Sequence, residues 1–374
     1  MKKISVLIPD GENLILEYVI NCFAKTRDVK VYVMSNKKDN FIRFSRHVEK
    51  FLFLKKTDST LDWINNIDEQ IEKFNIDLIL PVFEHGIKEL IKNKSKLKHK
   101  SKLVPLPSLG NFNSARNKWL LYKHLNLYNF ACPDSVIIPH NQLPNVRDFT
   151  FPVIAKTVEG HGGGKGVKFL KDQKDLLNYY KTISFSCDTI IQEYIAGYDI
   201  CTNVLCKDGE ILAFSIQKAT LFEKGDFTYQ IGFDFVKNEN LMQITKNLMS
   251  SLNWSGVANI DWRYDTEEKQ FKAIEINTRY WFNTDASAIA GVNFPYLNCL
   301  LGIGISFEEP NSNLISYLNL RGVLKTLKKR PLMIFNFSFL KNNTPLFFVL
   351  RDPLPIIYKF IWRTKNIIIS KFRN

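Results

Sequence analysis

The sequence predicts an α/β domain with an open parallel sheet, then an α+β region with antiparallel sheets, and finally a basic C-terminal extension. Two apolar runs near the N-terminus flank a segment with helical spacing, which is typical of a β-α-β unit. In the central region, apolar runs are joined by short polar turns, which favours antiparallel pairing. The end of the chain is set apart by its charge.

The composition is that of a globular protein. The chain has 374 residues, of which 45% are hydrophobic and 24% charged, so it is long enough for two or three compact units. Its six cysteines form no CxxC pair, so we expect neither a zinc cluster nor a disulfide framework, and we expect a cytoplasmic location. The first apolar run, Ile4–Ile8, is too short for a signal peptide, and no stretch reaches the ~20 apolar residues of a membrane-spanning helix.

Positive charge is concentrated at the C-terminal end. The whole chain has a net charge of +14, and residues 321–374 carry twelve Lys or Arg residues against one acid, Asp352. The preceding residues are nearly neutral as a group. The basicity therefore belongs to the tail and not to the central region.

Residues 1–110 are expected to form the α/β domain. Strands are predicted at Ile4–Ile8 and Val29–Val33, on either side of a helix, and a further buried strand is predicted at Asp77–Phe83. A ligand crevice would open after that strand, at residues 84–86, since open α/β sheets bind ligands at the carboxyl ends of their strands. The first strand is not followed by GxGxxG, which argues against a dinucleotide site.

Residues 111–150 are predicted to form a linker. Helical spacing over residues 114–130, with Ser114 as a candidate N-cap, precedes a loop that contains Pro139 and Pro144. This linker would connect the first domain to the α+β region.

The α+β region is expected to contain a small subdomain or lid at 151–216 and a large subdomain at 217–310, followed by the extension at 311–374. In the small subdomain the pattern gives a strand, a glycine-rich loop, a strand, a helix, and then strands that include a hairpin turn at residues 207–210. A longer helix is predicted at about residues 238–253, before two strands joined by a polar turn.

A glycine-rich segment follows an apolar strand that ends at Lys156. The loop, residues 160–166, includes Gly162, Gly163 and Gly164. Without Cβ atoms, such a loop can bring several backbone N–H groups close to phosphate oxygens, and a lysine at the strand end adds a point charge. A flexible turn is the alternative explanation for the glycines, and an exposed lysine at a strand end is the alternative for Lys156.

Two acidic residues and an amide lie on neighbouring predicted strands. Asp261 follows Asn259 by two residues, and Glu275 and Asn277 lie on the next strand. Two carboxylates and an amide oxygen are hard ligands, which suit Mg²⁺ together with substrate phosphates. Either acid alone is more typical of a strand edge, but their order after the lysine and the glycine loop predicts a Mg–nucleotide site.

In this order the residues resemble the ATP-grasp superfamily, in its carboxylate–amine (thiol) ligase branch. The resemblance covers roughly residues 1–310 and rests on Lys118, Lys156, the loop Gly160–Gly166, Gln192-Glu193-Tyr194-Ile195, Gly197, Asp199, Asp261 and Glu275-Ile276-Asn277-Thr278-Arg279. It implies that the first domain is a Rossmann-like pre-ATP-grasp domain and that residues 151–310 form a two-lobed ATP-grasp fold.

The resemblance also implies contacts to ATP. These are implied for Lys118, Lys156, Gly162, Gly163, Gly164, Gln192, Glu193, Tyr194, Ile195 and Asp199. The lysines would reach the phosphates, the backbone of the run from Glu193 to Ile195 would bind the adenine edge, and Asp199 would hold the ribose hydroxyls. A solvated helix lysine is the alternative for Lys118, and a simple turn is the alternative around Asp199.

The resemblance further implies a metal site and two catalytic candidates. Asp261, Glu275 and Asn277 would hold Mg²⁺, with Mn²⁺ as a substitute. Arg279 would offer a planar fork to a carboxylate or to the transferring phosphoryl group, and Lys218 would add a phosphate contact.

An ATP-dependent ligase follows from these roles. Phosphoryl transfer to a small-molecule carboxylate would give an acyl phosphate and ADP, and an amine would then attack to form an amide or peptide-like bond with release of phosphate. Because the intermediate hydrolyses readily, the glycine loop and residues 222–233 are candidate lids. The carboxylation machinery of biotin carboxylase-like enzymes is not found. The alternative function is an ATP-binding phosphotransferase, or a nucleotide-binding module that does not ligate.

The extension interleaves aromatic and aliphatic residues with its positive charges. This composition suits peripheral contact with an anionic membrane surface, at the inner face of the membrane. The alternative is an element that packs on the ligase and presents a solvated basic face. Nucleic acid is not expected as a partner, because the excess of basic residues is confined to the terminus and no stacking module accompanies it. The sequence predicts no particular oligomeric state.

Overall fold

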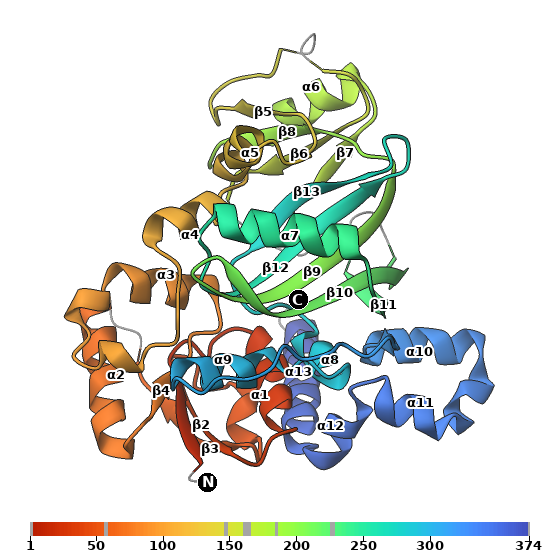
Figure 1. Ribbon diagram of the computed structural model, residues 1–374. Coiled ribbons are helices and arrows are strands. Elements are labelled where there is room, and N and C mark those ends of the chain that lie inside the picture. The colour runs from red at the N-terminus through yellow and green to blue at the C-terminus, as the bar shows by residue number, and fades with distance from the viewer. Residues whose placement is uncertain are drawn as a thin grey trace.

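The computed structural model describes residues 3–55, 59–145, 149–159, 166–183, 186–224 and 229–372, with side chains to residue 366. Within these ranges the chain forms a parallel sheet, two antiparallel lobes and a C-terminal helical layer (Figure 1). The predicted fold class is confirmed. Most of the predicted glycine loop lies outside the described residues, as does the middle of the predicted lid at 222–233.

The N-terminal domain is built on a parallel sheet with the strand order β3-β2-β1-β4. Its elements are β1 (Ile4–Ile8), α1 (Ile15–Phe23), β2 (Val29–Ser35), η1 (Phe41–Phe44), β3 (Val48–Phe53), α2 (Thr60–Phe74), β4 (Leu78–Ile79), α3 (Glu84–Lys92), η2 (Lys94–Lys96) and η3 (Lys100–Lys102). Strand β4 is shorter than the predicted Asp77–Phe83. Leu80 still donates its N–H to Leu7, but Pro81 has no N–H with which to continue the ladder.

The linker differs from the prediction, because two helices replace one. They are α4 (Leu109–Arg116) and α5 (Lys118–Leu127). The chain breaks at Asn117, which has an extended backbone and accepts hydrogen bonds from the N–H groups of Trp119 and Leu120. Ser108 caps the first helix, so the predicted N-cap at Ser114 is wrong: Ser114 lies inside α4.

The small lobe is a sheet with the strand order β5-β8-β6-β7, and α6 packs against it (Figure 1). Its elements are β5 (Ser135–Ile138), β6 (Val153–Thr157), β7 (Lys168–Leu170), α6 (Gln173–Thr182) and β8 (Thr189–Glu193). Residues 135–138, predicted as linker, therefore belong to this sheet, where they pair with β8.

The large lobe is a sheet with the strand order β13-β12-β9-β10-β11-β14. Its elements are β9 (Gly197–Lys207), β10 (Glu210–Phe222), β11 (Gln230–Val236), α7 (Glu239–Ser251), β12 (Gly256–Asp265), β13 (Gln270–Asn277) and β14 (Ser316–Leu318). The predicted subdomain boundary at residue 216 falls inside β10. The change of sheet lies instead between β8 and β9, because β9 pairs along its length with β12 and not with the small sheet.

The large lobe and the N-terminal domain share one apolar core. Ile8 and Leu78 of the parallel sheet pack in the same cluster as Leu205 of β9 and Phe294. Between them lie α8 (Thr284–Ile289) and α9 (Phe294–Gly302), which follow β13 in the chain (Figure 1). Residues from the first domain are thereby held against the ends of β12 and β13.

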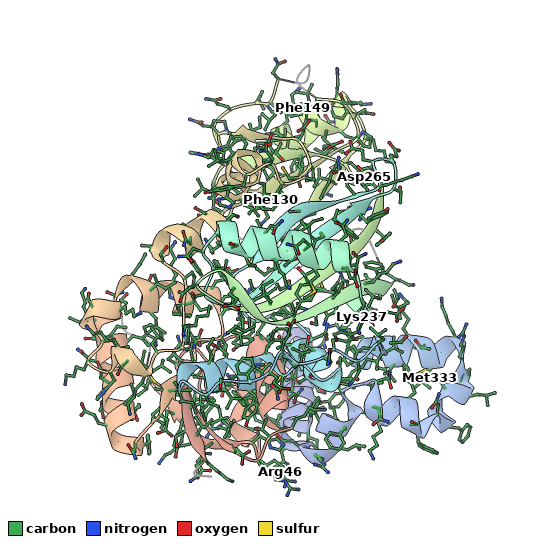
Figure 2. All side chains as sticks on the ribbon, viewed as in Figure 1. Arg46, Phe130, Phe149, Lys237, Asp265 and Met333 are labelled. Carbon is green, nitrogen blue, oxygen red and sulfur yellow. The ribbon has the colours of Figure 1, made fainter. Side chains whose placement is uncertain are left out.

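A C-terminal helical layer completes the fold. It comprises α10 (Leu320–Lys329), η5 (Pro331–Phe335), α11 (Phe337–Asn342), α12 (Leu346–Arg351) and α13 (Leu354–Phe372). In the view shown, α10 and α11 project at the lower right, beyond α8 and α13, and Met333 lies in this projecting part (Figures 1 and 2). Within the described part of the chain, no helix combines the length and apolarity needed to cross a membrane.

Candidate active site

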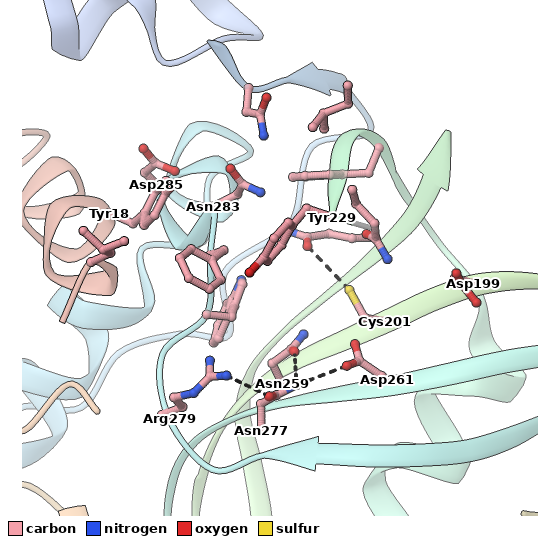
Figure 3. A pocket seen from close by; sticks show the side chains of 18 of the residues that line it. Tyr18, Asp199, Cys201, Tyr229, Asn259, Asp261, Asn277, Arg279, Asn283 and Asp285 are labelled. Atoms are coloured by element: carbon pink, nitrogen blue, oxygen red, sulfur yellow. Dashed lines mark hydrogen bonds between the residues drawn. The ribbon is translucent and has the colours of Figure 1, made fainter. Parts of the chain in front are cut away.

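Pairing of β12 with β13 brings the predicted metal ligands together. Asp261 lies opposite Glu275 in the antiparallel register, and Asn259 lies opposite Asn277. The Asn277 amide donates to Asp261 Oδ2 at 3.1 Å and to Asn259 Oδ1 at 3.0 Å (Figure 3). Asn259 in turn donates to Asn203 on β9 at 2.9 Å. A chain of amides therefore fixes the position of the Asp261 carboxylate.

Two lysines face this acidic pair from the small-lobe side. Lys118 begins α5, and its Nζ lies 3.2 Å from Glu275 Oε2. Burial would raise the pKa of Glu275, but the ammonium groups of Lys118 and then Lys156 outweigh it and hold the pKa at about 2. Burial, reinforced by the charge of Lys118, lowers the pKa of Lys156 to about 8. Glu275 is therefore ionised, and its charge is balanced within the protein.

The pKa of Asp261 is shifted in the opposite direction to that of Glu275. Burial, then the neighbouring charges of Glu275 and Asp199, raise its pKa well above the usual range. A cation bound here would relieve that penalty, so the residues present fit a divalent ion. Among the described residues, no group of three or more His, Cys, Asp or Glu side chains could hold a metal ion. Two carboxylates and an amide suit Mg²⁺, which takes its remaining ligands from water and substrate phosphates.

Arg279 is held beside this site by three contacts. Its Nη2 donates to Asn277 Oδ1 at 3.0 Å, its Nη1 donates to the Tyr280 carbonyl at 2.9 Å, and its Nε lies 3.5 Å from Glu84 Oε1. Glu84 begins α3, at the end of the parallel sheet where a ligand crevice was predicted, and it also pairs with Arg116. The first domain thus contributes an acid that positions Arg279.

The predicted adenine-binding residues line the cavity between the end of β8 and the start of β9. Gln192, Glu193, Tyr194, Ile195 and Asp199 all line the cavity described below. Backbone groups of the run have protein partners outside the strand ladders as well: Glu193 N–H donates to the Asp134 carbonyl, and the Ile195 carbonyl accepts from Arg263 Nε at 2.6 Å.

Arg263 was missed by the sequence reasoning. Its Nη1 also lies 2.5 Å from Asp199 Oδ1, so it ties the predicted ribose ligand to the run at Ile195. Arg263 follows Asp261 by two residues on β12, and this spacing on a strand was the signal that could have found it.

Lys218 lies apart from these residues. Its ammonium sits 4.1 Å from the centre of the Tyr198 ring. The preceding residue, Gln217, lines the cavity, and successive side chains of a strand point to opposite faces. A phosphate contact from Lys218 remains a prediction. Gly162, Gly163 and Gly164 lie outside the described residues.

One cavity of about 840 Å³ connects the acidic pair, the two lysines facing it and Arg279 to a second region. From the acidic pair the cavity passes Tyr229 and reaches Tyr18 of α1 (Figure 3). There it is also lined by Asn283, which precedes α8, and by Asp285 within α8. Side chains of the C-terminal layer, including Phe348, form a further wall. This volume is in the range of small-molecule sites.

Polar atoms at the second end of the cavity lack protein partners. Within the described residues, the buried atoms Asp285 Oδ1, Asn283 Oδ1 and Trp281 Nε1 have no hydrogen-bond partner. Asp285 Oδ2 accepts from Asn21 at 2.8 Å, and burial raises the pKa of Asp285 to about 7. Unpaired buried polar atoms are costly, so their convergence on one cavity marks a place for a polar ligand. No local motif pointed to them, because α1 and α8 are far apart in sequence.

The family is visible in the sequence as well as in the fold. Residues 115–281 match the family model described as an ATP-grasp domain. This match covers the two lysines, the acidic pair and Arg279. Residues 115–281 therefore form an ATP-grasp domain.

Individual relatives are distant. The carbamoyl-phosphate synthase of Methanobrevibacter smithii is 23% identical over 222 residues, which is 55% of this chain and 58% of that protein. The chain therefore aligns with little more than half of that curated relative.

Two solved structures share the fold. The N5-carboxyaminoimidazole synthetase of Staphylococcus aureus, solved with ADP, has a TM-score of 0.68 at 17% identity, covering 88% of this chain and 87% of the other. The L-amino acid ligase of Bacillus licheniformis has a TM-score of 0.59 at 18% identity, covering 83% of this chain and 75% of the other.

Proposed function

We propose that this protein is an ATP-dependent ligase that joins a small-molecule carboxylate to an amine. The observation that carries the proposal is the shared cavity. One end has the acidic pair with two lysines, and the other end has polar atoms without protein partners. A nucleotide and a second polar ligand would therefore meet in one cavity.

The nucleotide end supports phosphoryl transfer. Bound Mg²⁺, held by Asp261, Glu275 and Asn277, would supply positive charge to the phosphate oxygens. Lys118 and Lys156 would neutralise the transferring phosphoryl group, which moves from ATP to a substrate carboxylate oxygen and leaves ADP. The product of this step is an acyl phosphate.

Arg279 lies where it would orient the acid. Its guanidinium is held by Asn277 and Glu84 beside the metal ligands, and it lines the cavity. A planar fork at this position suits a carboxylate before transfer and an acyl phosphate after it. Attack of the amine on the acyl carbon would form the amide bond and release phosphate.

The second end of the cavity would hold a cationic group of one substrate. Asp285 Oδ1 and Asn283 Oδ1 are both hydrogen-bond acceptors without protein donors, and an ammonium group supplies three donors. Glu17 and Asp352 also line this part of the cavity, but Glu17 is paired with Lys359 at 2.9 Å and Asp352 accepts a hydrogen bond from Ser45. Asp285 is therefore the acid that remains for a ligand.

A substrate screen with Mg–ATP tests the proposal. Acids, with bicarbonate included, are combined with amines, and phosphate release is measured alongside product mass. The proposal predicts release that requires both an acid and an amine, and an amide product. Glu275→Gln is the inactive control, and Glu210→Gln, at an exposed hairpin position, is the matched active control.

The alternative is a phosphotransferase or a nucleotide-binding module that does not ligate, because the same nucleotide end would serve either. A stable phosphorylated product formed from one substrate alone would establish the phosphotransferase. Nucleotide binding without turnover across the whole panel would favour the binding module.

A further inference from the structure

The projecting part of the C-terminal layer exposes a group of large apolar side chains. We call Leu332, Ile334, Phe335 and Phe337, from η5 and the start of α11, the apolar tip. Leu332 is 78% exposed, Phe335 69% and Phe337 71%. Exposed apolar residues are ordinary when scattered, but a contiguous group marks an interaction surface.

Positive charges flank the apolar tip in sequence on both sides. We call Lys328, Lys329, Arg330 and Lys341 the basic collar; all four are exposed. In the part of the chain that the structure describes, no acidic side chain lies within ion-pair distance of any of them. Apolar side chains next to unpaired basic ones match a surface that is apolar inside and anionic outside.

Hydrogen bonds attach the projecting part to the rest of the fold. Asn343, after α11, donates to the Ser316 carbonyl of β14 at 2.7 Å, and Lys325 of α10 donates to the Phe222 carbonyl at 2.5 Å. Asp352, the one acid of residues 321–374, accepts from Ser45 Oγ at 2.5 Å and so ties the layer to the N-terminal domain.

We propose that the apolar tip and the basic collar dock this protein on an anionic lipid membrane. The tip would enter the boundary between headgroups and acyl chains, and the collar would contact lipid phosphates. A second copy of the chain is a poorer occupant, because two basic collars would face each other and repel. This inference does not depend on the enzymatic proposal.

Docking would place the cavity close to the membrane surface. The layer that carries the tip also lines the cavity, through Phe348, Asp352 and Lys359. Lys359 is fixed there by Glu17, at 2.9 Å from Nζ to Oε2. A substrate carried in the lipid surface would then reach the site without crossing bulk water.

Vesicle co-sedimentation of the full chain tests the collar. We expect binding to vesicles that contain phosphatidylserine and little binding to pure phosphatidylcholine. The combined change Lys328→Gln, Lys329→Gln and Arg330→Gln should weaken binding about a hundredfold, since each basic residue near an anionic surface contributes about 1 kcal/mol. The matched change Lys94→Gln, Lys96→Gln and Lys100→Gln, at exposed positions of the first domain, should leave binding nearly unchanged.

The apolar tip is tested separately. Leu332→Ser combined with Phe335→Ser and Phe337→Ser should weaken binding at least tenfold, whereas Leu127→Ser, at a position that is 75% exposed on α5, should not. Circular dichroism verifies that each variant is folded. The proposal is overturned if the tip and collar variants bind vesicles like the unchanged chain. It is also overturned if pelleting reflects self-association without lipid, or if RNA displaces the vesicles through the same collar.

Discussion

The two ends of the cavity differ in whether their buried polar atoms have partners within the protein. At the nucleotide end, Glu275 pairs with Lys118, and the Asp261 carboxylate accepts from a chain of amides that begins at Asn277. At the second end, Asp285 and Asn283 each keep a buried oxygen without a protein partner. The first arrangement holds these side chains in place, while the second leaves hydrogen-bonding capacity for a ligand.

The two ends of the cavity also differ in whether the family model covers them. The nucleotide end lies within residues 115–281, which match the ATP-grasp domain, whereas Asp285 and the α1 residues lie outside that range. Substrate choice should therefore depend on α1, α8 and the C-terminal layer. Changes at one end should leave the other end working, and the following predictions test that separation.

The largest effect is expected from Glu275→Gln. Loss of this carboxylate removes a metal ligand and leaves Lys118 without its partner, so turnover of Mg–ATP should fall about a thousandfold or more. Coupled phosphate-release kinetics measure this. Turnover that stays within a few-fold of the unchanged enzyme would mean that the acidic pair does not hold the metal.

A smaller and selective effect is expected from Asp285→Asn. Removing the charge of this buried carboxylate, which has an oxygen without a protein partner, should raise KM for one substrate roughly ten- to a hundredfold, with KM for ATP nearly unchanged. Steady-state kinetics with each reactant varied in turn give the comparison. An equal rise in both KM values would show that the two ends are not separable.

The nucleotide end should also respond to pH through Lys156. Its pKa is about 8, so the ammonium, which in the proposed site would face the phosphates, is charged below this value and neutral above it. Affinity for ATP should fall above pH 8, towards about tenfold per pH unit, and Lys156→Arg should move the fall to higher pH because a guanidinium stays charged. Calorimetric titrations between pH 7 and 9.5 provide the test. Parallel profiles for both proteins would exclude Lys156 as the titrating group.

The smallest effect is expected at the cap of α5. Asn117→Ala removes two hydrogen bonds at the start of the helix that carries Lys118, and it should lower the free energy of unfolding by about 1 kcal/mol. It should also weaken ATP binding slightly. The matched change Asn238→Ala, at the cap of α7, should cost similar stability without any effect on ATP. Thermal unfolding and ATP titration of both variants decide whether the cap positions Lys118.

Much of the fold could be predicted from patterns within short segments. The first strand at Ile4–Ile8 was predicted with its observed bounds, and the parallel sheet follows from alternating strands and helices. The break at Asn117 was missed because helical spacing continues across it. The boundary at residue 216 was misplaced because the change of sheet between β8 and β9 leaves no turn signal at the later position.

Likewise, some residues of the candidate site could be predicted from short sequence patterns and others could not. Asp261 and Glu275 were found because each lies in a recognisable run, and the register of β12 and β13 then places them opposite each other. Asp285 and Asn21 were not found because their hydrogen bond joins elements 264 positions apart in the chain. Such a pair becomes visible only when the first domain packs against α8.

The central claim is that the substrate carboxylate is activated as an acyl phosphate. The most direct test is whether an oxygen atom passes from the acid to the released phosphate. Once the screen has identified an acid and an amine, the acid is supplied with ¹⁸O in its carboxylate and the released phosphate is analysed by mass spectrometry. An acyl phosphate intermediate predicts one ¹⁸O atom in each phosphate formed, with label and amide both lost in Glu275→Gln. Phosphate without label, formed at the same rate as the amide, would contradict activation of the carboxylate by phosphoryl transfer.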